Sequence, residues 1–287
     1  MDLLPQLIVN GLVTGALLAI PAIGLTAIYA VLRFPNFSVA SHATIGAFAG
    51  YVANVTLGLP AAPAILAGFL VAGLIGVLSD EIALRPLRPY GALTAAIASI
   101  ALTVVLENMV RFGFGNELRG YDLPLVRDWR FWGIRIGPQQ VENFLLAVAI
   151  MAAVFAALRF TRIGKAMRAV ADNPALAELK GIDPVLVGRI TAFVGMGLAG
   201  AGGMLLGLGT SIDPLTGFRF ILPIFAAAVV GGLGSIPGAV LGAMIVGLGE
   251  ELSLLVLAPA YKSVVGFLAI VIVLIFRPRG LLGERAF

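Results

Sequence analysis

Most of this chain consists of long apolar segments joined by short polar connections. About 20 apolar residues are enough for a helix to cross the hydrocarbon core of a bilayer. Segments of this kind fall at 6–32, 41–58, 62–79, 91–113, 140–160, 187–210 and 261–276, with a further interrupted stretch at 221–257. With 60% hydrophobic and only 12% charged residues, the chain has too much apolar surface for one soluble core. The sequence predicts an all-α, polytopic transmembrane bundle of about 8 membrane segments, forming a single domain over residues 1–287.

The distribution of cations predicts the orientation of this bundle. Arg33, the pair Arg85 and Arg88, and a third group occupy alternate connections; the third group is Arg159, Arg162, Lys165, Arg168, Lys180 and Arg189. Because lysine and arginine are retained on the cytoplasmic side, we expect these connections inside. The longer, nearly charge-balanced loop 114–139 and the N-terminus are then outside.

The side on which the C-terminus lies limits the number of membrane crossings before the last span. Arg277, Arg279 and Arg285 favour an inside C-terminus, and the last span supplies one crossing. The stretch 221–260 must therefore supply an even number of crossings.

The glycine-rich run 231–238 interrupts that stretch and predicts a broken or re-entrant segment. Irregular backbone at membrane depth is tolerated where it lines a cavity or is buried in protein. Gly234 and Ser235 are therefore candidates for a substrate pathway, and a glycine-rich packing kink is the alternative. Small-residue spacings such as Gly11/Gly15 and Gly46/Gly50 predict close packing of helices.

Polar side chains within the spans supply further candidates for the pathway. One group lies where the first span passes into the second, and another lies late in the fourth span: Asn36, Ser38, Ser41 and Thr44, then Thr103, Glu107 and Asn108. Polar groups are costly in hydrocarbon and tend to face the bundle interior. Glu107 and Arg111 have the spacing of a helical ion pair, which is the alternative to a substrate contact.

Several kinds of chemistry are missing from the sequence. There is no cysteine, and Gly164-Lys165 is followed by Ala166 and so does not form a Walker A motif. The single histidine, His42, has no second ligand type around it and is more often a packed, hydrogen-bonded residue than a metal ligand. We expect no enzyme activity, no metal and no cofactor. The net charge of +4 is explained by cytoplasmic cations rather than by nucleic acid.

The basic segment 161–186 is the polar interruption that most needs a reason. Asp172 or Asn173 as N-cap, Pro174 in the first turn and Gly181 at the end predict a short helix over 175–180. Asp183-Pro184 predicts a second cap. Attraction to anionic lipid, about 1 kcal/mol per cation, explains the charge but not the two caps. A rigid helix favours docking to a cytoplasmic protein through this segment, with these candidate residues: Arg162, Gly164, Lys165, Arg168, Asp172, Asn173, Pro174, Glu178 and Gly181.

These residues resemble the coupling loop of branched-chain amino acid ABC permeases of the LivH/LivM type. The resemblance extends over essentially the whole chain in the right order, through the runs 85–88, 106–108 with 114–115, 161–169, 181–183, 200–203, 231–238 and 277–283. It is specific as a set, although each run alone is modest.

The resemblance implies a permease subunit of an ATP-driven importer of branched-chain or related amino acids in the bacterial inner membrane. Its implied partners are cytoplasmic ATPase subunits, which bind ATP and the 161–186 loop, a second permease subunit, homologous or identical, and an extracytoplasmic substrate-binding protein. The chain would need no cofactor of its own.

One run departs from the family pattern. The family usually has an Asn-Phe-Ala-His-Gly-Glu type motif after the first span, whereas Val39, Ala40 and Ser41 stand here in place of the His, Gly and acidic residue. Urea or short amides are therefore alternative substrates. A stand-alone secondary transporter or channel is an alternative function, and an intramembrane enzyme is disfavoured by the lack of a nucleophile–base pair.

Overall fold

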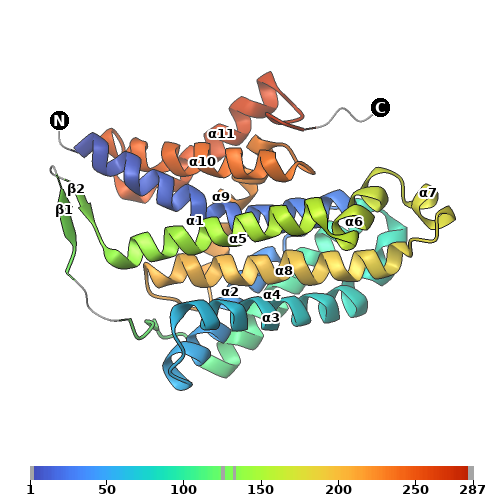
Figure 1. The fold of residues 1–287 in the computed structure, drawn as a ribbon, viewed down its shortest axis with the longest axis horizontal. Coiled ribbons are helices and arrows are strands. Elements are labelled where there is room, and N and C mark those ends of the chain that lie inside the picture. The colour runs from blue at the N-terminus through green and yellow to red at the C-terminus, as the bar shows by residue number, and fades with distance from the viewer. Residues whose placement is uncertain (1–2, 124–126, 132–133, 284–287) are drawn as a thin grey trace.

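The structure is a computed structural model that describes residues 3–123, 127–131 and 134–283, arranged as an elongated bundle of helices (Figure 1). The helices of the bundle are α1 (Leu3–Leu32), α2 (Val39–Tyr51), α3 (Ala61–Ser79), α4 (Ala92–Phe114), α5 (Pro138–Phe160), α8 (Pro184–Leu208), α9 (Thr216–Gly231), α10 (Ile236–Leu252) and α11 (Lys262–Phe276). Six helices among the described residues are long and apolar enough to cross a membrane: α1, α4, α5, α8, and α3 and α10 with the short turns that continue them. The chain is a multi-pass membrane protein, as the apolar segments predicted.

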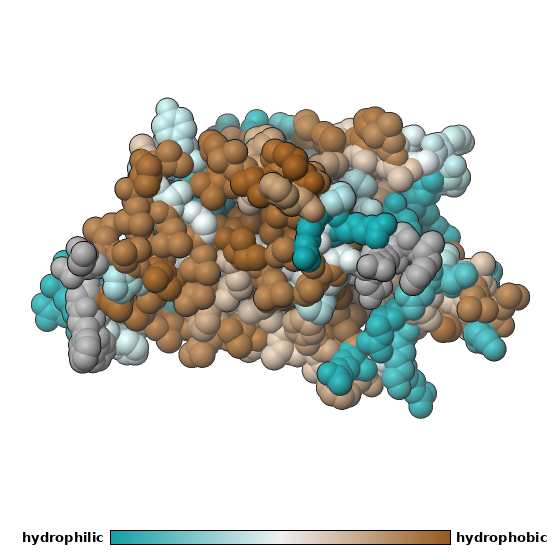
Figure 2. All heavy atoms as spheres, turned by 90° about the horizontal axis from the view of Figure 1, so that it is seen from above, coloured by the Kyte–Doolittle hydropathy of each residue, from teal (hydrophilic) through white to brown (hydrophobic). Residues whose placement is uncertain are grey.

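Hydrophobic side chains form the surface along the middle of the bundle, and hydrophilic ones gather towards its two ends (Figure 2). The N-terminus and the loop between α4 and α5 lie at one end, and the segment between α5 and α8 lies at the other (Figure 1). The two predicted sides, basic and charge-balanced, are therefore at opposite ends of the molecule. Arg285, one of the cations used to predict the orientation, lies outside the described residues.

The interrupted stretch 221–260 forms a hairpin of two helices, α9 and α10. Gly231 and Gly238 face each other across the turn so closely that a Cβ on either would lie less than 3.0 Å from the other's backbone. Helix α10 runs antiparallel to α1, because Gly11 packs on Leu248 and Gly15 on Met244. The stretch thus forms two helices of opposite direction.

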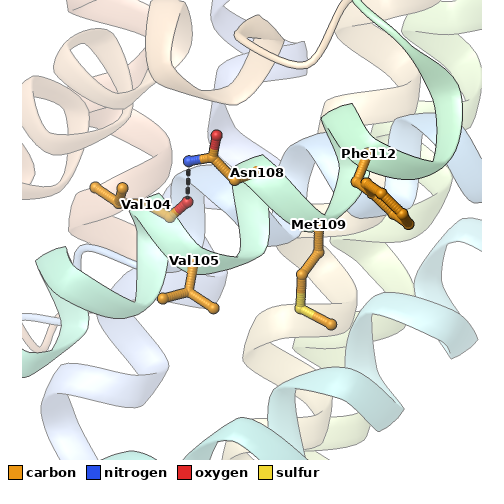
Figure 3. Close-up of a pocket in the computed structure, with 5 residues that line it drawn as sticks. All are labelled: Val104, Val105, Asn108, Met109 and Phe112. Carbon is orange, nitrogen blue, oxygen red and sulfur yellow. Dashed lines mark hydrogen bonds between the residues drawn. The ribbon is translucent and has the colours of Figure 1, made fainter.

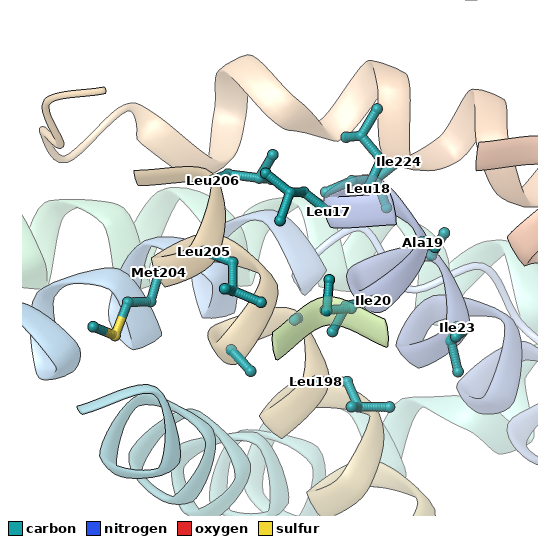
Figure 4. Close-up of a cluster of buried hydrophobic side chains, with 14 of the residues drawn as sticks. Leu17, Leu18, Ala19, Ile20, Ile23, Leu198, Met204, Leu205, Leu206 and Ile224 are labelled. Atoms are coloured by element: carbon teal, nitrogen blue, oxygen red, sulfur yellow. The ribbon is translucent and has the colours of Figure 1, made fainter. Parts of the chain in front are cut away.

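Small residues hold the bundle together. A Cβ added to Gly24 of α1, Gly46 of α2 or Gly200 of α8 would meet a neighbouring helix at less than 3.0 Å. In a bilayer, where apolar side chains gain little by leaving lipid, such close approach gives the van der Waals contact that drives helix association. The larger side chains of α1 and α8 fill the remaining space with Ile224 of α9 (Figure 4): Leu17, Leu18, Ile20, Ile23, Leu198, Met204, Leu205 and Leu206.

Helix α2 is the central and most enclosed element. Of its 13 residues, all but Ala49 and Tyr51 are buried. It begins within the bundle, because the Thr44 hydroxyl accepts a hydrogen bond from the Gly217 amide of α9 at 2.9 Å. Residues 33–38 therefore carry the chain from the end of α1 back into the interior.

The loop between α4 and α5 corrects the all-α prediction in one detail. Strands β1 (Trp129–Phe131) and β2 (Ile134–Ile136) pair antiparallel, with Arg130 opposite Arg135. Gln6 of α1 anchors this ribbon by accepting from the Arg135 amide at 2.7 Å and donating to its carbonyl at 3.0 Å. Apolar residues alternate with arginine in both strands, a period-2 pattern that a search for long spans passes over.

Candidate functional site

The basic segment folds as two short helices rather than one. Helix α6 (Arg162–Asp172) begins at Thr161, whose hydroxyl accepts from the Gly164 amide at 3.1 Å. The helix predicted from the sequence in this segment was only the one over 175–180, so α6 is an addition. Ile163, Met167 and Val170 recur at helical spacing among polar residues, and this amphipathic pattern could have revealed it.

The second helix, α7 (Pro174–Leu179), confirms the predicted capping. The Asn173 carboxamide accepts from the Leu176 amide at 3.0 Å, which identifies Asn173 rather than Asp172 as the N-cap. Gly181 ends the helix with φ = +80°, a conformation that favours glycine. The Asp183 carboxylate accepts from the Val185 amide at 2.8 Å and so caps α8, as predicted.

A small apolar cluster fixes α6 and α7 to the ends of the long helices. Met167 and Val170 of α6 and Ala177 of α7 are buried against Val187 of α8, with Val31 of α1 beside them. Any displacement of α6 and α7 therefore acts directly on the ends of α1 and α8.

The opposite face of α7 is exposed and apolar. Leu176 is 54% and Leu179 is 85% exposed at the end of the bundle. The candidate residues predicted in this segment were polar side chains, glycines and Pro174, and included neither leucine. Their separation of three residues, with the buried Ala177 between them, puts them on a face that a groove in another protein can cover.

The predicted charged residues of the segment have different surroundings. Arg162, Lys165, Asp172 and Glu178 are exposed. Arg168 instead donates to the Leu158 carbonyl of α5 at 2.6 Å. Gly164 packs so closely on Leu158 that no Cβ would fit. Arg168 and Gly164 therefore position α6 on the end of α5.

A network of charges surrounds the same end of the bundle. Glu81 forms salt bridges with Arg85 at 2.6 Å and with Arg189 of α8 at 2.7 Å, and Asp80 forms one with Arg88. A cavity of about 190 Å³ lies between these groups and residues Val170, Pro174 and Pro184 of the basic segment. The network ties the end of α3 to α8 next to α6 and α7.

The first predicted pathway group is gathered in one place and is fully buried. The Asn36 carboxamide accepts from both the amide and the hydroxyl of Ser38, at 3.0 and 2.7 Å, and the Ser41 hydroxyl donates to the Ser38 carbonyl at 2.9 Å. The Thr44 hydroxyl accepts from the Gly217 amide at the start of α9. The polar atoms of these side chains therefore form hydrogen bonds within the protein, around the start of α2.

His42 is likewise a hydrogen-bonded residue of the interior, as predicted. Its Nδ1 lies 2.7 Å from the Ser38 carbonyl, and its Nε2 lies 3.4 Å from the Ser79 hydroxyl of α3. The ring therefore joins α2 to α3.

The second pathway group lies on α4, and Figure 3 shows one of its members, Asn108, among its neighbours on that helix. Thr103 is buried and donates to the Ser99 carbonyl at 2.9 Å, whereas Glu107 pairs with Arg111 at 3.0 Å, as its spacing predicted. Asn108 is exposed and donates to the Val104 carbonyl at 2.7 Å, so its amide oxygen is left on the outer face of the helix. That face carries an open groove of about 510 Å³ lined by Val104, Val105, Asn108, Met109 and Phe112.

The third pathway group, Gly234 and Ser235, lies in the turn between α9 and α10. The Ser235 hydroxyl accepts from the Gly238 amide at 3.2 Å and so caps α10. Gly234 has φ = +96°, with no atom near the position of a Cβ. The neighbouring Gly232 packs on Arg279 and Gly283 of the C-terminal segment, so this group does not join the other two.

The described residues form a multi-pass membrane protein, a bundle of apolar helices with a basic amphipathic segment docked on one end. The chain belongs to the family described as the branched-chain amino acid transport system / permease component, which matches residues 7–274. The chain is 32% identical to the high-affinity branched-chain amino acid transport system permease protein BraD of Pseudomonas aeruginosa, over 97% of this chain and 95% of that protein. It is 31% identical to the permease protein LivH of Escherichia coli, over 97% and 95%.

The fold also has a solved counterpart. The structure of PsaBC from Streptococcus pneumoniae in complex with Fab superposes with a TM-score of 0.50, covering 94% of this chain and 91% of that one. At 14% identity this similarity concerns the fold alone.

Proposed function

We propose that this protein is the permease subunit of an ATP-driven importer for branched-chain or related amino acids in the bacterial inner membrane. BraD and LivH, which match nearly the whole chain, are named as permeases of branched-chain amino acid transport. Its partners are cytoplasmic ABC ATPase subunits, a second permease subunit and an extracytoplasmic substrate-binding protein. ATP is bound by the ATPase subunits.

The observation that carries this proposal is the docked pair of helices α6 and α7. Two capped helices fixed by an apolar cluster make a rigid platform, and its outer face presents Leu176 and Leu179 beside Glu178 and the cations of α6. Anionic lipid headgroups would attract the cations, but this attraction does not require a rigid pair of helices. A groove of an ATPase subunit would cover the leucines and pair with the charges around them.

We place the substrate pathway along the outer face of α4. An exposed amide such as Asn108 is costly against hydrocarbon, and that cost is avoided if the face meets water or a second permease subunit. The groove around Asn108 then becomes part of the route between two permease subunits. In this arrangement the buried group at 36–44 shapes the bundle without touching substrate, and Ser235 belongs to a hinge at the turn between α9 and α10.

The membrane crossings follow from the same scheme. We propose that α9 and α11, with 16 and 15 residues, complete the membrane-embedded part beside the longer helices, with α2 enclosed at the centre. The segment 161–186 and the C-terminus then face the cytoplasm. Residues 1–287 act as one permease domain.

Copurification with the ATPase tests the proposal. The wild-type chain should hold an ABC ATPase through purification in detergent, and Leu179→Asp, Glu178→Lys or Gly181→Val should release it. Tyr90→Asp is the matched control, because Tyr90 is also exposed (76%) but lies outside the segment. Release by Tyr90→Asp alone, or an ATPase that never associates, would refute the proposal.

A further inference from the structure

The linker between α1 and α2, residues 33–38, contacts the basic segment at one end and α4 and α9 at the other. Its first residue, Arg33, donates to the Ala171 carbonyl at the end of α6. Arg33 also has φ = +61°, which is unfavourable for a residue with a Cβ. A strained residue that is held in place by a contact with another element is often a functional position.

The middle of the linker is locked against the end of α3. Phe34 is 1% exposed and packs with Leu84 and with Ala95 of α4. The guanidinium of Arg88 lies over the Phe34 ring, 5.5 Å from its centroid, while it pairs with Asp80. These packed groups thus hold the linker in place at Phe34.

The far end of the linker is bound to α4 and α9. The Phe37 amide donates to the Ser99 hydroxyl of α4 at 2.9 Å. The Phe37 ring stacks on Phe225 of α9, with centroids 4.6 Å apart and planes at 8°. Asn36 holds the turn between these contacts through its two hydrogen bonds to Ser38. A displacement of α6 at Arg33 is therefore passed along a short, hydrogen-bonded segment to two helices of the bundle.

We propose that Arg33 and Phe37 are positioning residues that couple α6 and α7 to α4, so that movement driven at the basic segment changes the face on which Asn108 lies. This inference rests on the proposed function, since it assumes that an ATPase moves α6 and α7. Coupling between two sites is reciprocal, so substrate arriving from the binding protein should also act on the ATPase through the same residues.

The test uses the assembled complex in proteoliposomes with its ATPase and leucine-loaded binding protein. Uptake per ATP hydrolysed is measured for Arg33→Met, which keeps an unbranched stem but removes the guanidinium donor, and for Phe37→Leu, which removes the stacked ring. Arg33→Lys keeps a donor and should restore part of the loss. Arg277→Met is the control: Arg277 is another exposed cation, and the hydrogen bonds found for it among the described residues involve only its backbone.

We expect both variants to bind the ATPase and hydrolyse ATP, while uptake per ATP falls about fivefold or more, the size of a typical allosteric coupling. Stimulation of hydrolysis by the loaded binding protein should fall as well. Uptake per ATP equal to that of Arg277→Met in both variants overturns the inference and leaves the proposed function standing. If Arg33→Met fails to assemble, Phe37→Leu decides the matter, because Phe37 packs on α4 and α9, at the far end of the linker from the basic segment. A wild-type complex that neither assembles nor hydrolyses ATP would instead refute the proposed function.

Discussion

Gly46 of α2 and Gly200 of α8 pack backbone against backbone at the centre of the bundle, so that a Cβ on Gly46 would lie less than 3.0 Å from the Cα of Gly200. The neighbour is another helix's main chain and cannot rotate away. The closeness of α2 and α8 therefore depends on the absence of a side chain at Gly46.

Gly46→Ala should destabilise the protein by about 1–3 kcal/mol, the usual cost of overpacking a core. Thermal unfolding in detergent, followed by circular dichroism, measures the effect. Gly113→Ala is the matched control, because Gly113 is helical and has no atom near its Cβ position. We expect that control to be neutral or slightly stabilising. Equal melting temperatures for Gly46→Ala and the wild type would contradict the packing described.

Asn173→Ala should weaken binding of the ATPase by loosening α7. The variant loses the cap on the Leu176 amide, worth typically about 1 kcal/mol of helix stability. Asn173→Asp, which preserves the acceptor, should bind as the wild type does. The amount of ATPase retained on immobilised permease distinguishes the two variants, and an unchanged yield for Asn173→Ala would show that the cap does not matter for docking.

The Tyr121 hydroxyl donates to the Ala47 carbonyl of α2 at 2.9 Å, and burial raises the pKa of this phenol. Tyr121→Phe should cost about 0.5–1.5 kcal/mol of stability, since it removes the hydrogen bond. Tyr261→Phe, at an exposed tyrosine, should cost less.

A pH dependence follows from the raised pKa of Tyr121. Above about pH 10 the phenol ionises in the unfolded chain but stays protonated in the folded one, so the folded state binds more protons and stability falls with rising pH. The contribution is fully present below that pH. Tyr121→Phe should therefore lose less stability than the wild type between neutral and strongly alkaline pH. Parallel pH profiles would argue that this phenol is not buried.

Asn108 offers a direct test of the pathway on α4. The chain has no cysteine, so Asn108→Cys introduces a single thiol. A water-soluble, membrane-impermeant thiol reagent should modify it and block uptake, and the loaded binding protein should change the rate of modification. Ile97→Cys is the control on the same helix, 59% exposed and on an apolar part of the surface. If Ile97→Cys and Asn108→Cys react equally slowly, α4 faces lipid at Asn108.

Much of the fold could be predicted because membrane helices are specified locally. Apolar length locates α1, α3 and α8 to within a few residues, and the capping residues Asn173 and Asp183 locate the short helix and the start of α8. The i, i+4 spacing of Glu107 and Arg111 is equally local. In each case the interacting groups are close in sequence, so neighbouring residues suffice for the prediction.

The placement of the candidate residues could not be predicted in the same way. Whether Thr44 faces a pathway or binds Gly217 depends on α9, which lies far along the chain. It also depends on the glycines that allow α2 to pack closely against α3 and α8. The contact from Arg33 to Ala171 likewise joins segments 138 residues apart. Hydropathy says which side chains avoid lipid, but not which of them meet each other.

The claim that ATP drives this chain through α6 and α7 is tested by uptake of radiolabelled leucine into proteoliposomes containing the assembled complex and loaded binding protein. We predict uptake that requires ATP on the ATPase side and is lost in Leu179→Asp while Tyr90→Asp retains it. Uptake by the permease alone without nucleotide, or full ATP-driven uptake by Leu179→Asp, would contradict the claim.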